Sequence, residues 1–223
     1  YIKKNKPNSK IIVLDQKDKF SKQALFSNGW KELYGDLIDW RAAQFGGKVL
    51  SVDPVKKIVV TEDEEVQADV LNYIPNQKAS QLAFDSGLVA DGKDWCDIHP
   101  KTFESKLVKN VHVIGDASNA APMPKSAFSA STQGKVVALQ IARMLKQQEP
   151  LNPPKLANTC YSLLSPNYGI SIAAVYNALD DKIQNVDGAG GVSPETDPDG
   201  HIRILEAKYA YAWYESQTAD IFK

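Results

Sequence analysis

The segment that most constrains the fold is residues 111–145, where a short apolar run leads through a glycine into a long helical pattern. Val111–Ile114 predicts a short buried strand, and it continues directly into Gly115–Ala117, with the sequence Gly-Asp-Ala. Ser129–Leu145 predicts a helix, because its apolar residues recur near one face. A buried strand, a turn and a helix in this order are typical of an open α/β fold, in which ligands collect at the carboxyl ends of the strands.

The turn between this strand and this helix carries groups that suit a ligand. Gly115 has no Cβ, so the backbone there can approach a ligand closely. Asp116 can accept a hydrogen bond from a ribityl or ribose hydroxyl, and the N-terminus of the following helix favours negative charge. Ser126 or Ser129 would cap that helix. The alternative is that Asp116 is an ordinary turn residue in front of a helix.

Upstream of this turn the patterns alternate between strand and helix. Ile11–Leu14 predicts a buried parallel strand that ends in Asp15. An acidic residue in that place can bind a nucleotide ribose, but no GxGxxG motif precedes it, and a loop-capping role is the alternative. Phe20–Tyr34 predicts one or two helices. A meander of three strands is then expected over Lys48–Val52, Lys57–Thr61 and Val66–Ile74.

The remaining chain is organised by a proline-rich break. Asn76–Leu88 is expected to be helical, and the prolines within Gln147–Lys155 predict a domain boundary. Beyond that boundary, Tyr168–Tyr176 is apolar and β-prone, whereas Ile202–Phe222 is rich in aromatic residues.

Composition argues against several classes of protein. Lys plus Arg is 26 and Asp plus Glu is 27, which lacks the basic excess of nucleic-acid-binding proteins. No apolar run approaches the roughly 20 residues that span a bilayer. The opening YIKKNKPNSK has no signal-peptide core and resembles the end of a helix, so we expect the chain to begin within a longer protein. No metal site is expected, since no histidine has metal-ligand spacing: His99, His112 and His201.

The residues from Gly115 to Lys135 carry a resemblance to a known family. Their sequence, GDASNAAPMPKSAFSASTQGK, resembles the second flavin-contacting motif of the flavin-binding subunit of flavocytochrome c sulfide dehydrogenase, a member of the disulfide reductase superfamily. The similarity includes IIVLDQKDKFSKQALFSNGW and ADVLNYIPNQ upstream, and NTCYSLLSPNYGISIAAVY and YAYAWYE downstream. The resemblance implies an α/β fold, a partial two-dinucleotide-binding-domain flavoprotein (FAD/NAD(P)-like) with a C-terminal α+β domain.

The resemblance also implies a division into three parts. Residues 1–75 would be the remainder of the NAD-like second domain, 76–148 the returning segment of the FAD-binding domain, and 149–223 the family's C-terminal domain, which helps to seat the cytochrome. The cofactor would be FAD. The first GxGxxG turn is absent, so we expect an incomplete FAD site and an inactive chain on its own. The positions assigned to FAD binding are Gly115, Asp116, Ala117, Met123, Pro124, Lys125 and Ser126.

One cysteine and one tryptophan receive roles from the same resemblance. Taken alone, Cys160 is an inert core thiol. The matching cysteine of the family forms a redox-active disulfide beside the flavin, so we predict that Cys160 is catalytic and that its partner lies outside this chain. A Cys96–Cys160 bridge is the alternative. Trp213 is either a core aromatic residue or part of the electron path between flavin and haem.

The implied activity is the oxidation of sulfide. Sulfide adds to the disulfide, the flavin takes two electrons, and a c-type cytochrome subunit removes them one at a time. A periplasmic location follows from the resemblance, because c-type cytochrome partners reside there. One alternative is a sulfide:quinone or NADH:quinone oxidoreductase, whose apolar membrane-attaching C-terminus differs from the polar, aromatic one here. A second alternative is a non-catalytic cytochrome-binding module.

Overall fold

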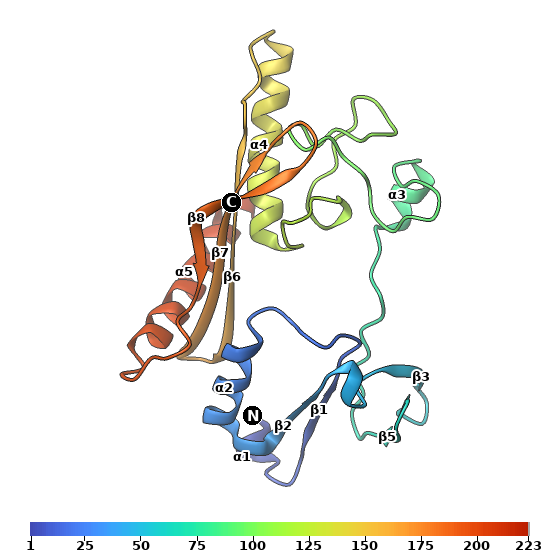
Figure 1. Cartoon of the computed structure of the whole chain (residues 1–223), viewed down its shortest axis with the longest axis vertical. Helices are drawn as coiled ribbons and strands as arrows, with labels where there is room; N and C mark the ends of the chain where they lie inside the picture. Colours follow the sequence, from blue (N-terminus) through green and yellow to red (C-terminus); the bar gives the residue numbers. More distant parts are fainter. Residues whose placement is uncertain (223) are drawn as a thin grey trace. The chain divides into compact units, whose positions relative to one another are not determined.

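The computed structural model describes residues 1–222, which form two compact units (Figure 1). Unit 1 contains residues 1–75, 163–170 and the described chain from 194 onward; unit 2 contains residues 76–162 and 171–193. Helices and strands occur in both units, which confirms the mixed α/β class. No helix among the described residues is long and apolar enough to cross a membrane.

Unit 1 begins with a parallel strand–helix–strand unit. After the short helix α1 (Ile2–Asn5), strand β1 (Ile11–Leu14) pairs in parallel with β2 (Ile38–Arg41), and α2 (Gln23–Tyr34) lies between them in sequence. Two neighbouring parallel strands must be joined by a long crossover connection, because a tight turn reverses the direction of the chain and would make the strands antiparallel. The parallel strand predicted over Ile11–Leu14 is confirmed, but the prediction that it is buried is wrong, because Ile12 and Val13 are exposed. The second predicted segment forms a single helix.

Aromatic side chains fill the space between α2 and β2. Phe20 lies 5.1 Å from Trp40 and Phe26 lies 5.3 Å from Trp30, measured between ring centroids. These spacings are typical of tilted and edge-to-face aromatic pairs. Close approach elsewhere on α2 depends on Gly29, since a Cβ there would lie 2.3 Å from a side-chain carbon of Leu164.

An antiparallel meander follows η1 (Gly35–Leu37), β2 and η2 (Ala43–Phe45). Its strands are β3 (Val49–Asp53), β4 (Ile58–Thr61) and β5 (Glu65–Gln67), paired in this order. The third strand was predicted to continue to Ile74, which is wrong beyond Gln67. Residues 68–75 pair with no strand, and the apolar side chains Val70, Tyr73 and Ile74 are exposed. A segment with alternating apolar residues forms a β-strand only where a neighbouring strand has free backbone N–H and C=O groups to pair with it.

The first half of unit 2 is largely irregular. Helix α3 (Gln81–Asp85) is shorter than the predicted helix. The strand predicted over Val111–Ile114 is wrong: this stretch makes one isolated bridge, between His112 and Glu104, and no ladder. Val113 is buried and donates its amide to the carbonyl of Phe103. Val111 and His112 are only partly buried and Ile114 is exposed, and the irregular loop that Val113 contacts offers no continuous edge for pairing.

Within unit 2, the longest helix and strands occur in the second half. Helix α4 (Ala127–Leu145) runs beside β6 (Lys155–Ser165), and the hydroxyl of Thr132 donates to the carbonyl of Ala157 over 2.9 Å. Strands β6, β7 (Tyr168–Ala178) and β8 (Ile183–Val192) pair in this order (Figure 1). The predicted helix and the predicted β-prone segment are both confirmed. Fully buried core residues of this unit include Cys96, Phe103, Leu156 and Ala178.

Helix α5 (His201–Phe222) belongs to unit 1. Its buried residues Arg203, Ala207 and Ala210 are spaced along one face. A Cβ on Gly169 would lie 2.4 Å from the backbone nitrogen of Ala207, so the helix and the start of β7 are in backbone contact. Trp213 lies one turn beyond Ala210 and is half-buried.

Candidate functional site

The Gly-Asp-Ala turn forms a short 3₁₀ helix, η3 (Gly115–Ala117), ahead of α4. Gly115 has a φ of +66°, a left-handed conformation that favours glycine. Its amide donates to the Oε1 atom of Gln133 over 2.7 Å, and the Gln133 side chain is 2% exposed. The turn is thus fixed to the helix by a buried side-chain contact, and sequence analysis had not identified Gln133.

Lys125 holds the far end of the same turn. Its ammonium donates to the backbone carbonyls of Asp116, at 2.6 Å, and Ser118, at 2.9 Å. It also lies 3.7 Å from the ring centroid of Trp95, which is a cation–π contact. Burial lowers the pKa of the Lys125 ammonium, against the opposing effect of the Asp116 carboxylate. The ammonium therefore closes the loop back onto its own start.

Cys96 is joined to this turn by backbone hydrogen bonds. Its amide donates to the carbonyl of Ala117 over 2.9 Å, and its carbonyl accepts from the amide of Asn119 over 2.8 Å. The Cys96 side chain has no exposed surface, and burial raises the pKa of its thiol. Cys96 is a packing residue of the loop, and the alternative Cys96–Cys160 bridge is not formed in the described chain.

A hollow of about 170 Å³ opens over the turn. Its volume is smaller than the roughly 300–1,000 Å³ that encloses a drug-sized ligand. The hollow is therefore too small to enclose a whole flavin nucleotide. Asp116 is exposed and does not line the hollow. Predicted positions that line the hollow are Gly115, Met123, Pro124 and Lys125, together with the additional residues Trp95, Ser118, Asn119 and Gln133.

Ser126 is the residue that caps α4. Its hydroxyl oxygen accepts the amide of Ser129 over 3.1 Å, and its backbone is extended as an N-cap requires. Of the two serines considered from the sequence, Ser126 is therefore the cap. Ser129 is buried within the first turn of the helix.

Cys160 lies on β6, half-buried, and is joined to the same helix end. The amide nitrogen of Asn158 lies 3.2 Å from the Cys160 sulfur. The amide oxygen of Asn158 accepts hydrogen bonds from Ser126, at 2.6 Å, and Ser129, at 3.0 Å. We call these four residues the Asn158 network. Sequence analysis missed Asn158, although alternate residues of a strand share a face and Asn158 lies two positions before Cys160.

Other candidates from the sequence have local roles. Nδ1 of His112 is 2.8 Å from the carbonyl oxygen of Thr102. Asp15 accepts the amide of Lys17 over 3.0 Å, as expected of a loop-capping residue. Within residues 1–222, no three His, Cys, Asp or Glu side chains gather as a metal site would require.

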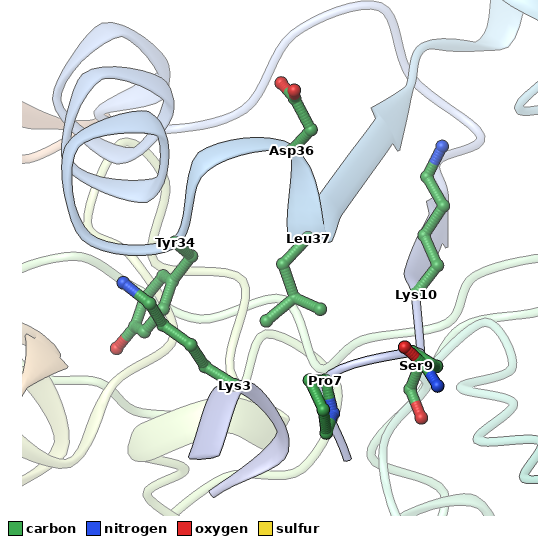
Figure 2. A pocket seen from close by; sticks show the side chains of 8 residues that line it. Lys3, Pro7, Ser9, Lys10, Tyr34, Asp36 and Leu37 are labelled. Atoms are coloured by element: carbon green, nitrogen blue, oxygen red, sulfur yellow. The ribbon is translucent and has the colours of Figure 1, made fainter. Parts of the chain in front are cut away.

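A second hollow, of about 430 Å³, occurs in unit 1 and includes none of the predicted site residues. Figure 2 shows that its walls come from α1, from the segment before β1, and from the end of α2 with η1. Lys3 donates to the carbonyl of Leu33 over 2.5 Å, and Lys10 pairs with Asp39 over 3.4 Å. Both cations that line this hollow are thus engaged by protein groups.

Comparison with protein families places the chain in a class. Residues 152–222 match the family model described as "Flavocytochrome c sulphide dehydrogenase, flavin-binding", so the protein is a flavoprotein and its cofactor is a flavin. Residues 1–75 match the model described as "Sulfide dehydrogenase (flavocytochrome c) flavoprotein chain, central". Together these ranges cover about two thirds of the chain, which belongs to the family of flavocytochrome c sulfide dehydrogenase flavoprotein subunits.

The family match confirms the resemblance seen in the sequence, and it divides the candidate residues. Cys160 and Trp213 fall inside the flavin-binding match, whereas the turn from Gly115 to Ser126 lies between the two matched ranges. Trp213 belongs to unit 1 and Cys160 to unit 2. The individual roles of these residues remain predictions.

Proposed function

We propose that this chain supplies one edge of the FAD site and one redox cysteine of a sulfide dehydrogenase that passes electrons to a c-type cytochrome. The observation that carries the proposal is the Asn158 network, in which the helix that follows the Gly-Asp turn is hydrogen-bonded to the residue beside Cys160. The family match supports a flavin-linked sulfide dehydrogenase over the quinone-linked alternatives.

The turn before α4 is suited to the sugar-like part of the cofactor. Asp116 presents an exposed carboxylate that can accept a hydrogen bond from a ligand hydroxyl, and Gly115 leaves the backbone open to close approach. The capped N-terminus of α4 adds positive potential, which favours a negatively charged group of the ligand. A bound flavin would accept an electron pair from sulfur and release the electrons singly.

The domain organisation that supports this function is also a proposal. The parallel unit β1–α2–β2 suits the remainder of an NAD-like domain at residues 1–75. Residues 76–148 would be the FAD-domain segment, and 149–223 the C-terminal domain that seats the cytochrome. On the same family grounds we propose a periplasmic location, where c-type cytochromes reside.

Cys160 would act in the first chemical step. Sulfide attacks a disulfide between Cys160 and a cysteine outside this chain, so one sulfur gains a bond to sulfide and the other leaves as a thiolate with the electron pair. Cys160 is half-buried on β6 and is not enclosed in the core as Cys96 is.

The test is the substitution Cys160→Ser in the complete complex with its cytochrome. We expect sulfide-dependent haem reduction to fall by orders of magnitude, because a covalent catalyst is lost, while flavin absorbance is retained. The matched control is Cys96→Ser, at a thiol that serves packing only, for which turnover per folded molecule is expected to be unchanged. Normal turnover in Cys160→Ser would refute the proposed role.

A further inference from the structure

Trp95 lines the hollow over the Gly-Asp-Ala turn and lies outside both ranges that match the family models. Its side chain is half-buried and packs against the core of unit 2. The ring faces the ammonium of Lys125, which lies 3.7 Å from the ring centroid. The face of an aromatic ring attracts a cation within about 6 Å of the centroid, and Trp does so most strongly. Trp95 is therefore in close electrostatic contact with the residue that closes the turn.

The ammonium of Lys125 has a partner within this chain for each of its donors. An ammonium carries three N–H groups. Two of them are directed at the carbonyl oxygens of Asp116, at 2.6 Å, and Ser118, at 2.9 Å. The face of the Trp95 ring is the third partner. A ligand that took one of these donors would displace a contact that holds the turn, so the ammonium is suited to shaping the turn.

The backbone next to Trp95 fixes the distance between its ring and the turn. Cys96 donates its amide to the carbonyl of Ala117 over 2.9 Å and accepts the amide of Asn119 over 2.8 Å. Cys96 and Ser118 thereby form an isolated parallel bridge. Hydrogen bonds of this kind are directional. One segment thus holds the turn twice, by the backbone of Cys96 and by the ring of Trp95.

We propose that Trp95 is a positioning residue for the cofactor turn: its ring holds the Lys125 ammonium, which in turn holds the carbonyls of Asp116 and Ser118. This inference rests on the proposed role of the turn in FAD binding and deepens it. It assigns Lys125 to the shape of the turn and not to a direct contact with the flavin. A turn that has its shape before the ligand arrives loses less conformational entropy on binding.

The first experiment observes the turn in the full chain, without flavin. Trp95→Leu keeps an apolar side chain and removes the ring face. Hydrogen exchange is measured at the backbone amides of Gly115 and Asn119, which are both hydrogen-bonded in the folded turn. We expect exchange at both amides to be about threefold faster than in wild type, because opening of the turn no longer breaks a cation–π contact. Trp95→Phe retains a weaker ring face and should lie between the two.

The matched control is Phe84→Leu, at another partly buried aromatic residue of the same core. Phe84 faces the ammonium of Lys78 at 5.1 Å from its ring centroid, away from the turn. We expect exchange at Gly115 and Asn119 to match wild type in this variant. Equal acceleration in Phe84→Leu overturns the role of Trp95, because the effect would then be a general loosening of the core.

A double-mutant cycle tests whether the ring acts through the ammonium. Lys125→Met removes the charge, and Trp95→Leu is then expected to accelerate exchange no further in that background. A further threefold acceleration in the double variant overturns the proposal, because the ring would then act by packing alone. If Trp95→Leu does not fold, Trp95→Phe is compared with and without Lys125→Met in the same way.

The last measurement links the turn to the cofactor. In the complete flavoprotein, bound flavin per folded molecule is measured by absorbance, and we expect a loss in Trp95→Leu and in Lys125→Met but none in Phe84→Leu. Faster exchange with wild-type flavin content overturns the link between the shape of the turn and the cofactor. None of these results bears on whether Cys160→Ser abolishes sulfide oxidation, which is measured separately.

Discussion

Two regions of the molecule are held in place by different interactions. In unit 2, the turn before α4 is fixed by polar side chains: Gln133 binds the amide of Gly115, and Lys125 binds two carbonyls of the loop. In unit 1, α5 is held by backbone contact, since Gly169 leaves no room for a Cβ against Ala207. Hydrogen bonds are directional, whereas close packing is mainly steric.

This contrast indicates which positions tolerate substitution. Gly169 tolerates no larger residue, because a side chain there would collide with the backbone of Ala207 on α5. The polar turn leaves carboxylate and amide groups exposed at the surface, among them Asp116 and Asn119. The turn is thus fixed by directional hydrogen bonds and keeps polar groups at its surface, whereas α5 is fixed by close packing against Gly169.

The largest effect is expected at the steric contact. Gly169→Val places a branched side chain where a Cβ alone would lie 2.4 Å from backbone, so we expect the free energy of unfolding to fall by about 3 kcal/mol. Urea denaturation measures this loss. The control is Gly191→Ala, where a Cβ meets nothing within 4 Å, and a change within about 0.5 kcal/mol is expected. Equal effects would contradict the packing argument.

A second substitution asks whether α5 has a role besides packing. Trp213→Ala removes a half-buried aromatic residue and is expected to cost about 2 kcal/mol, less than a fully buried one. As a predicted part of the electron path, it should also slow haem reduction per folded molecule in the complete complex. Stopped-flow haem reduction and melting temperature are measured together, with exposed Tyr211→Ala as the control. Loss of stability alone would make Trp213 a core residue.

The polar turn should respond to loss of its buried amide. Gln133→Leu leaves the amide of Gly115 without its acceptor, and we expect a cost of about 1.5 kcal/mol together with weaker flavin retention in the complex. Gln81→Leu, at an exposed glutamine that pairs with Asp85, serves as the control. A Gln133 variant with wild-type stability and flavin content would show that the turn does not depend on this contact.

The smallest effect is expected at Lys125. Lys125→Met removes the cation–π contact and two hydrogen bonds near the surface, at a cost of about 1 kcal/mol. Because the pKa of the folded ammonium lies below its unfolded value, the unfolded chain binds more protons between the two values. Wild-type stability relative to Lys125→Met should therefore rise as pH increases through that window, just below the ordinary lysine pKa. A difference that is constant with pH would contradict this.

The sequence was informative where a periodic pattern and a good end signal coincide. The bounds of the helix after Ser126 and of strand β1 were predicted closely, because the spacing of apolar residues along the chain indicates the type of secondary structure. The motif from Gly115 onward and the residues around Cys160 led to the correct family. The strand at Val111–Ile114 was wrong, because an apolar run does not specify that a neighbouring backbone edge is present for pairing.

By itself, the sequence determined the family, the flavin cofactor, helix α4 and strand β7, since these depend on local motifs and periodicity, whereas strands β6 and β8 were not predicted. Only the tertiary structure placed Gln133 on Gly115 and set Asn158 between Ser126 and Cys160. The reason is physical: partners of a buried amide are chosen by packing between segments 18 to 32 residues apart, which leaves no periodic trace along the chain.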